Sequence, residues 1–261
     1  MAATELIIYL PVYNAEATIA SLLDRLCTTA KLIGKKPLNM ALKAVILVND
    51  GSCDNTLTIL KGISREKTPW LHVLDKKQNK GAVDAVLDGM RKSLEMAAGN
   101  DKYIIVRMDS DLEHQPEDLL KLLQPIKDHK TDLVVGYIPF DRRNGFFASL
   151  FNRYIGLAES REFLGLDIPQ FCPGFYATRT SVLIRTFPEA EKMAILFKKT
   201  YNKEMIAIDF VSIVLAKRLG NRISTVLLSP IENKWIKKMP LKRLFSYLYS
   251  HKEIISFIRE Q

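Results

Sequence analysis

The stretch Tyr103-Ile104-Ile105-Val106-Arg107-Met108-Asp109-Ser110-Asp111 joins an apolar run directly to two carboxylates. The run is typical of a β-strand that is buried on both faces, as the strands of parallel sheets are. Burying two carboxylates within such a strand would be costly, so we expect them where the strand emerges at its carboxyl end. In open α/β sheets this edge is where ligands bind. The stretch therefore predicts an α/β fold with an acidic ligand site at the end of one strand.

Asp109 and Asp111 carry like charges that repel each other unless a cation lies between them. A hard divalent ion such as Mg²⁺ or Mn²⁺ would relieve this repulsion and could also bind substrate phosphates. The alternative is a solvated turn before the N-terminus of a helix, a place that also favours Asp. An isolated Asp-x-Asp favours the solvated turn, and only the other motifs of the chain reverse that preference.

The composition limits the classes of protein to which this chain can belong. Its 261 residues are 48% hydrophobic, which is enough to bury a sizeable core. With 38 Lys and Arg against 29 Asp and Glu the net charge is +9, which suits a nucleotide, another polyanion or an anionic membrane surface. Its three cysteines are widely spaced, which argues against a disulfide framework or zinc site and fits a reducing cytoplasm. No signal peptide pattern and no run of about 20 apolar residues is present, so we expect any membrane contact to be peripheral.

Expected strands and helices alternate through the first half of the chain. Strands are predicted at 5–13, 43–48, 70–74, the apolar part of 103–111, and 132–137. Helices are expected to begin at Asn14, Asp54, Asn79–Gly81 and Pro116. Asn14 is the expected N-cap of the first helix, which would run to about Gly34 and carry Glu16 in its first turn.

This alternation predicts a doubly wound α/β fold, a mostly parallel sheet with helices on both faces. The carboxyl ends of the strands then bring Pro11, Asp50 and Asp109 to one rim. Three separate turns that carry acids or chain breakers at the same edge are hard to explain by solvation alone. The topology therefore favours a ligand site at this rim.

The second half of the chain is less regular. Helices are expected at 146–159 and 207–219, strands near 173–177 and at 222–228, and a basic segment that becomes helical at 231–261. The sequence contains no internal repeat, low-complexity segment or linker. We therefore expect residues 1–261 to form a single domain.

Four short motifs follow one another in the first half of the chain. They are Pro11-Val12-Tyr13-Asn14-Ala15-Glu16, Asn49-Asp50-Gly51-Ser52, Asn79-Lys80-Gly81 with Ala85 and Gly89, and Asp109-Ser110-Asp111-Leu112-Glu113-His114. Together they resemble the nucleotide-sugar half of family 2 glycosyltransferases, above all the dolichyl- and polyprenyl-phosphate sugar synthases. The resemblance covers roughly the first 140 residues, and four motifs in register are specific where any one of them is weak.

The resemblance implies a GT-A fold and an inverting enzyme, in which residues 1–140 bind the nucleotide sugar and residues 141–261 form the acceptor half. It also implies a role for each matching position. It assigns the nucleobase and ribose pocket to Pro11, Tyr13 and Glu16, and base or ribose binding to Asp50. It places Lys80 and Gly81 near the nucleotide, and it assigns metal and diphosphate binding to Asp109, Asp111 and Glu113.

Three positions depart from the usual pattern of that family. Asn49 replaces the first acid of the usual Asp-Asp-Gly-Ser, a change that could weaken or retune nucleotide binding. Glu113 stands where the lipid-phosphate relatives usually have Gln, and Glu is at least as good a ligand for a hard cation. Cys172 and Pro173 occupy the neighbourhood where those relatives usually have an acid.

Two acids are candidates for the catalytic base that a hydroxyl acceptor would require. Asp209 has a spacing that resembles the acidic base position of many family 2 enzymes, and the alternative is an ordinary acid at a helix N-terminus. Asp167 is the second candidate, although the corresponding acid of the relatives lies closer to Gly174-Phe175. Arg142 and Arg143 could bind a donor or acceptor phosphate, because guanidinium groups match its geometry, or could form an ordinary solvated loop.

Basic and apolar residues interleave near the C-terminus. Lys234 begins a cluster of basic residues that ends at Arg243, and from Leu241 the apolar positions follow helical spacing. This basic amphipathic helix could dock on an anionic leaflet to reach a lipid-linked acceptor, or could pack its apolar side on the domain. We assign the segment around Trp235 to membrane or acceptor contact, with Lys234 near the acceptor phosphate. Nucleic acid is not an expected partner, because no nucleic-acid-binding motif accompanies the charge.

We therefore expect a metal-dependent inverting glycosyltransferase at the cytoplasmic face of the membrane, with polyprenyl phosphate as its acceptor. A diphosphate is a poor leaving group until its charge is neutralised, and Mg²⁺ or Mn²⁺ would do this. The alternatives are a glycosyltransferase for a glycan or a protein, a non-catalytic nucleotide-sugar binding protein, and a nucleotidyltransferase. The last normally has a glycine- and arginine-rich phosphate loop near its first strand, where this sequence has Pro11–Glu16.

Overall fold

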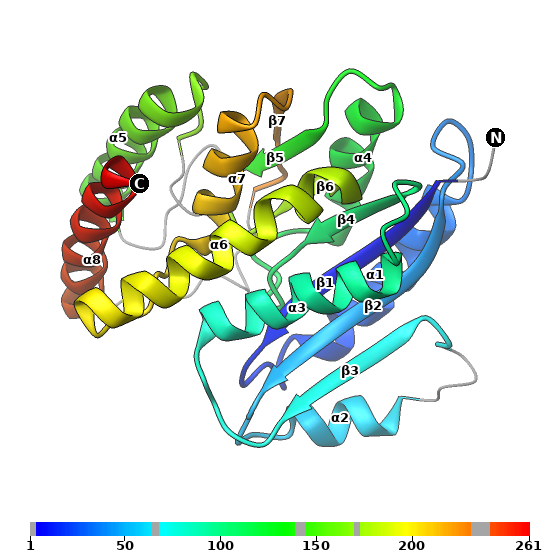
Figure 1. The fold of residues 1–261 in the computed structure, drawn as a ribbon. Coiled ribbons are helices and arrows are strands. Elements are labelled where there is room, and N and C mark those ends of the chain that lie inside the picture. Colours follow the sequence, from blue (N-terminus) through cyan, green and yellow to red (C-terminus); the bar gives the residue numbers. More distant parts are fainter. Residues whose placement is uncertain (1–3, 64–67, 139–144, 170–172, 231–240) are drawn as a thin grey trace.

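The computed structural model describes residues 4–63, 68–138, 145–169, 173–230 and 241–261 (Figure 1). For residues 145–152 and 241–249 it describes the backbone alone. In this part of the chain the strands are β1 (Glu5–Val12), β2 (Ala41–Asp50), β3 (Leu71–Lys76), β4 (Tyr103–Arg107), β5 (Leu133–Tyr137), β6 (Tyr176–Arg179) and β7 (Ile223–Leu227). The helices are α1 (Ile19–Ile33), α2 (Thr56–Gly62), α3 (Ala82–Ala97), η1 (Pro116–Asp118, a 3₁₀ turn), α4 (Leu119–Lys127), α5 (Gly145–Leu164), α6 (Thr180–Tyr201), α7 (Ile208–Arg218) and α8 (Leu241–Glu260).

The strands form one sheet in the order β3-β2-β1-β4-β6-β5-β7. The strand β6 runs antiparallel to both of its neighbours, β4 and β5, and every other neighbouring pair is parallel. The structure thus confirms the predicted mostly parallel sheet. It adds that β6, which comes after β5 in the chain, is inserted between β4 and β5.

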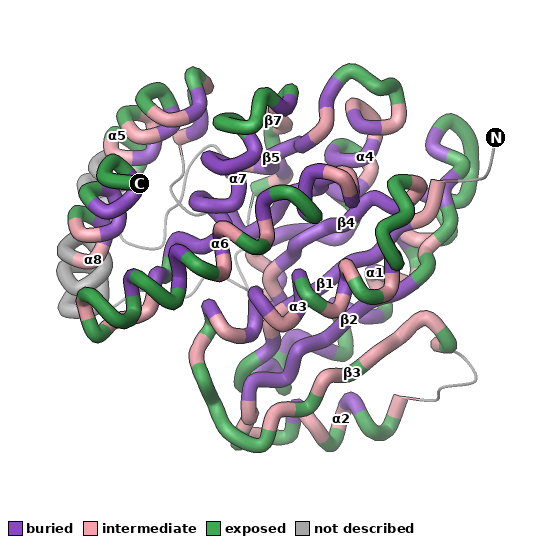
Figure 2. The backbone as a smooth tube through the Cα atoms, viewed as in Figure 1, coloured by how far each residue is buried: buried purple, intermediate pink, exposed green. Residues whose placement is uncertain are grey.

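Both faces of the sheet are covered, so most of the length of its central strands is buried (Figure 2). Successive side chains of a strand point to opposite faces. Ile7 and Tyr9 of β1 pack in a cluster with α3, α6 and α7, whereas Leu6 and Ile8 pack in a second cluster with α1 and α4. A strand that is buried on both sides therefore carries apolar residues along most of its length. The helices on both faces confirm the doubly wound fold.

The strand pairing brings the three predicted turns to one edge of the sheet. The strand β1 lies between β2 and β4, so that Pro11 pairs with Val48 and Tyr9 pairs with Arg107. Beyond the end of β4, the Ser110 hydroxyl donates a hydrogen bond to the carbonyl of Pro11, at 2.9 Å. We call this edge, where β1, β2 and β4 end, the carboxyl rim.

The prediction that Asn14 caps the first helix is wrong. The helix α1 begins at Ile19, with Thr18 at the N-cap position, and Asn14 has a left-handed backbone with φ 49°. The side-chain oxygen of Asn14 instead accepts a hydrogen bond from the backbone N–H of Cys53, at 2.9 Å. Asn14 therefore ties the turn after β1 to the turn after β2, and this contact between distant segments cannot be read from local sequence.

The 22-residue helix α6 has no counterpart among the expected elements. It contains Pro188, a residue that usually breaks helices, and it packs against α3 and α7 (Figure 1). Its buried residues include Leu183, Ala190 and Phe197. In the described part of the chain, no helix combines the length and the apolar character needed to cross a bilayer.

Close packing at Gly89 of α3 provides a test of this arrangement. A Cβ at Gly89 would lie 2.4 Å from Cδ2 of Tyr9, whose buried hydroxyl shares a 2.9 Å hydrogen bond with that of Tyr176. Because this ring has no room to move, we expect Gly89→Ala to lower the free energy of unfolding by about 1–3 kcal/mol, measured by urea denaturation. The control is Gly62→Ala in α2, where no atom of the described residues lies within 4 Å of the added Cβ. Equal losses of stability in the two variants would contradict this packing.

Candidate active site

Asp109 lies at the carboxyl rim, just beyond β4, and is partly exposed. Its Oδ1 forms an ion pair with Nη1 of Arg107, at 2.8 Å. Its Oδ2 lies 3.4 Å from Nδ1 of His114. Both oxygens therefore face nitrogen atoms of the protein, and the carboxylate has a defined orientation before any ligand arrives.

Arg107, the last residue of β4, is buried with 5% of its surface exposed. Its Nη1 also donates a hydrogen bond to the carbonyl of Gly174, at 3.0 Å, and its Nη2 lies 3.3 Å from Oδ2 of Asp209. Burial by itself lowers the pKa of Arg107, but the charges of Asp109 and Asp209 outweigh this effect and raise it. The guanidinium is therefore charged, and its buried charge is compensated by carboxylates on two sides.

Asp209 lies in the first turn of α7, with 6% of its surface exposed. Burial raises the pKa of Asp209 to about 6. The charge of Asp109 adds to this rise, whereas Arg107 and a hydrogen bond from Tyr176 oppose it. The acid expected to serve as a base thus lies beneath the rim, in a buried ion pair.

Two buried tyrosines extend this polar network into the sheet. Tyr9 of β1 and Tyr176 of β6 share a hydrogen bond between their hydroxyls. Burial, together with the charge of Asp209, raises the pKa of both, so both are neutral. We call Tyr9, Arg107, Asp109, Tyr176 and Asp209 the Arg107 network, because the charged arginine connects its acids.

Asp50 is buried at the end of β2 and supports the loop before α3. Its carboxylate accepts hydrogen bonds from the backbone N–H groups of Lys80, at 3.1 Å, and Gly81, at 2.8 Å. Its Oδ1 also lies 2.9 Å from Nζ of Lys76. Asp50 therefore shapes the loop that carries Lys80 and Gly81, and its role in binding a base or ribose stays a prediction. The exposed side chain of Lys80 is left at the surface of this loop.

The backbone conformation at Gly81 favours glycine. Its φ is 101°, and a Cβ there would lie 2.2 Å from Oε1 of Glu204. Burial raises the pKa of this glutamate, which lies in the connection between α6 and α7. Sequence reasoning missed Glu204, because only the folded chain places it against Gly81.

The departure at Asn49 has a local physical reason. Asn49 is buried, and its Nδ2 donates a hydrogen bond to Oδ1 of Asp75, at 2.7 Å. Its own Oδ1 accepts a hydrogen bond from the hydroxyl of Ser52, at 2.6 Å. An aspartate at this position would place a second negative charge against Asp75, so the amide suits this neighbour.

The turn after β1 carries three of the residues expected to bind the nucleotide. Pro11 is partly buried, whereas Tyr13 and Glu16 are exposed. The Oε2 atom of Glu16 accepts hydrogen bonds from the backbone N–H and the side-chain amide of Asn55, both at 2.9 Å. Tyr13 thus offers an exposed ring near the rim, while Glu16 braces the turn against the segment before α2.

Of the base and acceptor candidates not yet placed, the described residues include Asp167 alone. Asp167 is exposed over 70% of its side chain and pairs with Arg161, at 2.5 Å. Its role as a base stays a prediction. Arg142, Arg143 and Lys234 lie outside the described residues.

A metal would find two carboxylates at the rim. Asp111 is partly buried, and its Oδ1 accepts a hydrogen bond from the backbone N–H of Glu113, at 3.1 Å. Within the described residues, no group of three or more His, Cys, Asp and Glu side chains forms a preformed metal cage. Mg²⁺ is usually bound by one or two carboxylates together with substrate phosphates and water. Asp109 and Asp111 fit an ion that binds together with a diphosphate.

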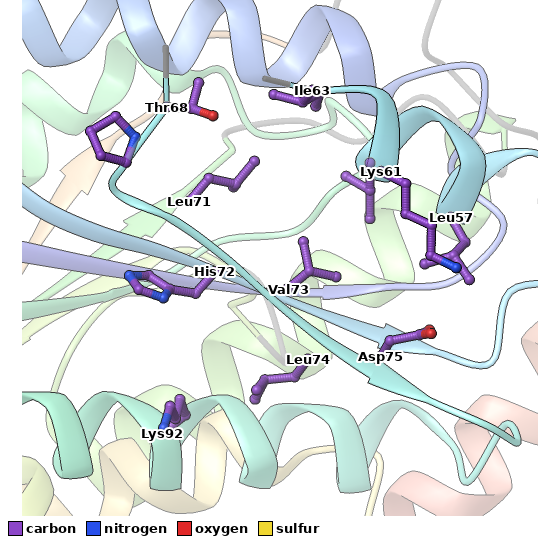
Figure 3. Close-up of a pocket in the computed structure, with 12 residues that line it drawn as sticks. Leu57, Lys61, Ile63, Thr68, Leu71, His72, Val73, Leu74, Asp75 and Lys92 are labelled. Atoms are coloured by element: carbon purple, nitrogen blue, oxygen red, sulfur yellow. The ribbon is translucent and has the colours of Figure 1, made fainter. Parts of the chain in front are cut away.

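A pocket lies away from these residues, between α2 and the edge strand β3 (Figure 3). Leu71 and Val73 of β3 line it, together with Leu57 and Lys61 of α2 and Lys92 of α3. Within the part of the chain that the structure describes, its lining includes none of the residues expected in the site. The carboxyl rim, and not this pocket, therefore carries the candidate active site.

Residues 7–187 match the family model for glycosyl transferase family 2. The chain belongs to this family. It is 30% identical over 143 residues to UDP-N-acetylglucosamine--dolichyl-phosphate N-acetylglucosaminyltransferase of Methanococcus voltae, over 50% of this chain and 51% of the relative. It is 27% identical over 154 residues to undecaprenyl-phosphate 4-deoxy-4-formamido-L-arabinose transferase of Yersinia pestis, over 59% of this chain and 42% of the relative.

The fold is that of GT-A glycosyltransferases. Glucosyl-3-phosphoglycerate synthase from Mycobacterium tuberculosis, solved with phosphoglyceric acid, superimposes with a TM-score of 0.58 at 21% identity, over 98% of this chain and 79% of the other. The same enzyme solved with uridine-diphosphate gives a TM-score of 0.55 at 20% identity, with the same coverage. The chain spans about half the length of the curated relatives it matches. Asp209 and Glu204 lie beyond the residues that match the family model.

The raised pKa of Asp209 predicts an unusual dependence of stability on pH. The pKa is 3.8 ordinarily and about 6 in the folded protein. The native state therefore holds this proton more tightly than the unfolded chain does, so the stabilisation is present below about pH 4 and is lost as the pH rises through 6. We expect the stability of the wild type relative to Asp209→Asn to fall by roughly 3 kcal/mol across this range.

Urea denaturation of both proteins at several pH values measures this difference. Ser212→Ala, which removes a buried hydroxyl from the next turn of α7, is the control and is expected to differ from the wild type by an amount that does not change with pH. A pH-independent difference between the wild type and Asp209→Asn would contradict the burial of an ionisable Asp209.

Proposed function

We propose that this family 2 protein is a metal-dependent inverting glycosyltransferase that moves a sugar from a nucleotide sugar to polyprenyl phosphate. The observation that carries the proposal is the position of Asp109. It lies at the carboxyl rim, oriented by Arg107 and His114, beside the turn of Asp111. Two curated relatives are named as transferases of dolichyl phosphate and undecaprenyl phosphate, which supports a polyprenyl phosphate acceptor.

The residues of the rim suit a nucleoside diphosphate. The loop supported by Asp50 presents the Lys80 side chain, whose positive charge can bind a phosphate. Tyr13 offers an exposed ring on which a nucleobase can stack. Asp109 and Asp111 would hold Mg²⁺ or Mn²⁺, which when bound neutralises the diphosphate and makes it a better leaving group. The complex of glucosyl-3-phosphoglycerate synthase with uridine-diphosphate supports UDP as the first nucleotide to test.

A phosphate acceptor agrees with the burial of Asp209. In an inverting transfer, the acceptor oxygen attacks the anomeric carbon from the side opposite to the leaving diphosphate. A hydroxyl acceptor would need a base within reach of its proton. A phosphate oxygen is already ionised and needs only positive charges to position it, and Arg142, Arg143 and Lys234 are proposed for this task. A glycan or protein acceptor would instead require a base such as the exposed Asp167.

We also propose that the reaction takes place at an anionic membrane surface facing the cytoplasm. Lys192, Ile195, Leu196 and Lys199 are exposed and share one face of α6, because both apolar residues lie three or four positions from each lysine. Ile195 is exposed over 64% of its surface. The helix ends at Tyr201, just before Glu204, which contacts Gly81 at the nucleotide loop. Lysines beside exposed apolar residues suit contact with anionic lipids close to the rim.

Asp111 provides the direct test of the donor site. We expect the melting temperature of the wild type to rise with one of UDP, GDP or dTDP, and to rise more when Mn²⁺ is present, because a ligand that binds only the native state stabilises it. Asp111→Ala should lose the Mn²⁺-dependent part of the shift and at least about tenfold in release of nucleoside diphosphate from the corresponding sugar nucleotide. Asp24→Ala, an exposed acid on α1, is the control. If Asp111→Ala kept the Mn²⁺-dependent shift in melting temperature and the turnover of the wild type, the site assignment would be contradicted.

The membrane contact is tested with vesicles. We expect the wild type to sediment with phosphatidylglycerol vesicles and much less with phosphatidylcholine vesicles, because the surface carries lysines. The double substitution Ile195→Asp with Leu196→Asp should reduce this binding several-fold. Ile184→Asp, nearer the other end of α6 and also exposed, is the matched control and should bind as the wild type does. Equal binding by all three proteins would rule out the α6 face as the docking surface.

A further inference from the structure

Asp209 is buried in an ion pair, an arrangement that favours a role other than that of a catalytic base. A base must reach a proton of the substrate, directly or through one water. Asp209 has 6% of its surface exposed, and its Oδ2 faces Nη2 of Arg107 at 3.3 Å. Arg107 is itself buried and lies between Asp209 and Asp109. This arginine is the charged group that connects Asp209 to Asp109.

The guanidinium of Arg107 connects three segments of the chain. It binds Asp109 beyond β4, the carbonyl of Gly174 before β6, and Asp209 in α7. The donors of a guanidinium lie in one plane and point in fixed directions, so the position of one partner constrains the others. Moving or removing the carboxylate of Asp209 therefore changes how Arg107 holds Asp109.

Gly174 restricts Asp109 from another side. A Cβ at this position would lie 2.2 Å from Oδ2 of Asp109 and 3.3 Å from Cε1 of His114. Asp109 is thus enclosed by Arg107, His114 and the backbone at Gly174, with its remaining exposure at the rim. Little freedom is left for the carboxylate to reorient when a ligand binds.

The charges of this group decide how attractive Asp109 is to a cation. With both acids ionised, the positive charge of Arg107 is shared between Asp109 and Asp209, and the three groups together carry a net charge of −1. Without the charge of Asp209 the group is neutral, and the whole guanidinium charge acts on Asp109. A divalent cation that approaches Asp109 would then be repelled by a buried positive charge that is less well compensated.

We propose that Asp209 is a positioning residue that acts through Arg107. It shares the guanidinium charge and anchors the group, so that Asp109 keeps the orientation and the net negative charge needed to bind a divalent cation together with the donor diphosphate. This inference rests on the proposed function, since it concerns the same metal-dependent nucleotide site. It assigns to α7 a role in donor binding instead of proton transfer.

The test measures binding without any chemistry. Calorimetric titration of UDP, with Mn²⁺ and separately with EDTA, is carried out on the wild type, Asp209→Asn, Asp209→Glu and Ser212→Ala. We expect Asp209→Asn to weaken the Mn²⁺-dependent binding of UDP about tenfold and to change the binding in EDTA much less, because only the cation site is altered. Asp209→Glu keeps the negative charge and should recover most of the loss. Ser212→Ala, in the next turn of α7, should bind as the wild type does.

The outcomes separate this inference from its rivals. If Asp209→Asn binds UDP and Mn²⁺ as the wild type does but loses turnover, Asp209 is a base and the proposal is overturned. Equal losses with Mn²⁺ and with EDTA, not recovered in Asp209→Glu, would reduce Asp209 to a structural role and also overturn it. A wild type that binds UDP, GDP and dTDP no better with Mn²⁺ than with EDTA would overturn the proposed function itself, and this inference with it.

Arg107→Lys keeps the proposal testable if Asp209→Asn does not fold. Lysine retains the positive charge but cannot contact Asp109, Gly174 and Asp209 in the directions that the guanidinium serves. We expect this variant to lose Mn²⁺-dependent UDP binding by a similar factor, although position 209 is intact. Wild-type binding by Arg107→Lys would overturn the proposal.

Discussion

The burial of one positive charge, on Arg107, constrains the whole active-site region. A guanidinium removed from water is strongly destabilising unless carboxylates and carbonyls compensate it. Here the compensating groups are Asp109, Asp209 and the carbonyl of Gly174. They come from the end of β4, the start of α7 and the turn before β6, so these three segments can be in place together only in one arrangement. The antiparallel insertion of β6 beside β4 is what brings Gly174 to Asp109.

A buried acid also supports the loop before α3 that carries Lys80 and Gly81. Asp50 lies under the loop, and its oxygens accept the backbone N–H groups of Lys80 and Gly81. Gly81 has a left-handed backbone and lies directly against Glu204. The rim is therefore built in two levels. Buried acids bind backbone and arginine from below, and the side chains of Tyr13, Lys80 and Asp109 are exposed or partly exposed at the surface.

The fold and the rim could be predicted because their signals are local. Strands buried on both faces are continuously apolar, and the acids and breakers at their ends mark where each strand leaves the sheet. What could not be predicted depends on contacts between distant segments. Asn14 looks like a helix cap but instead binds the backbone of Cys53. The helix α6 was missed because Pro188 interrupts its pattern, whereas in the folded protein packing against α3 and α7 stabilises the helix in spite of the proline.

From the residues alone, the doubly wound sheet, the rim where β1, β2 and β4 end, and the motifs that place the chain in family 2 could all be recognised. The folded chain was needed to show which of the candidate acids are partly exposed at the rim and which are buried beneath it. Asp50 and Asp209 look like ligand-binding or catalytic acids in the sequence, yet both are buried in contacts with basic or backbone groups. The physical reason is that burial, and with it the pKa and the availability of a carboxylate, is set by partners that lie far away along the chain.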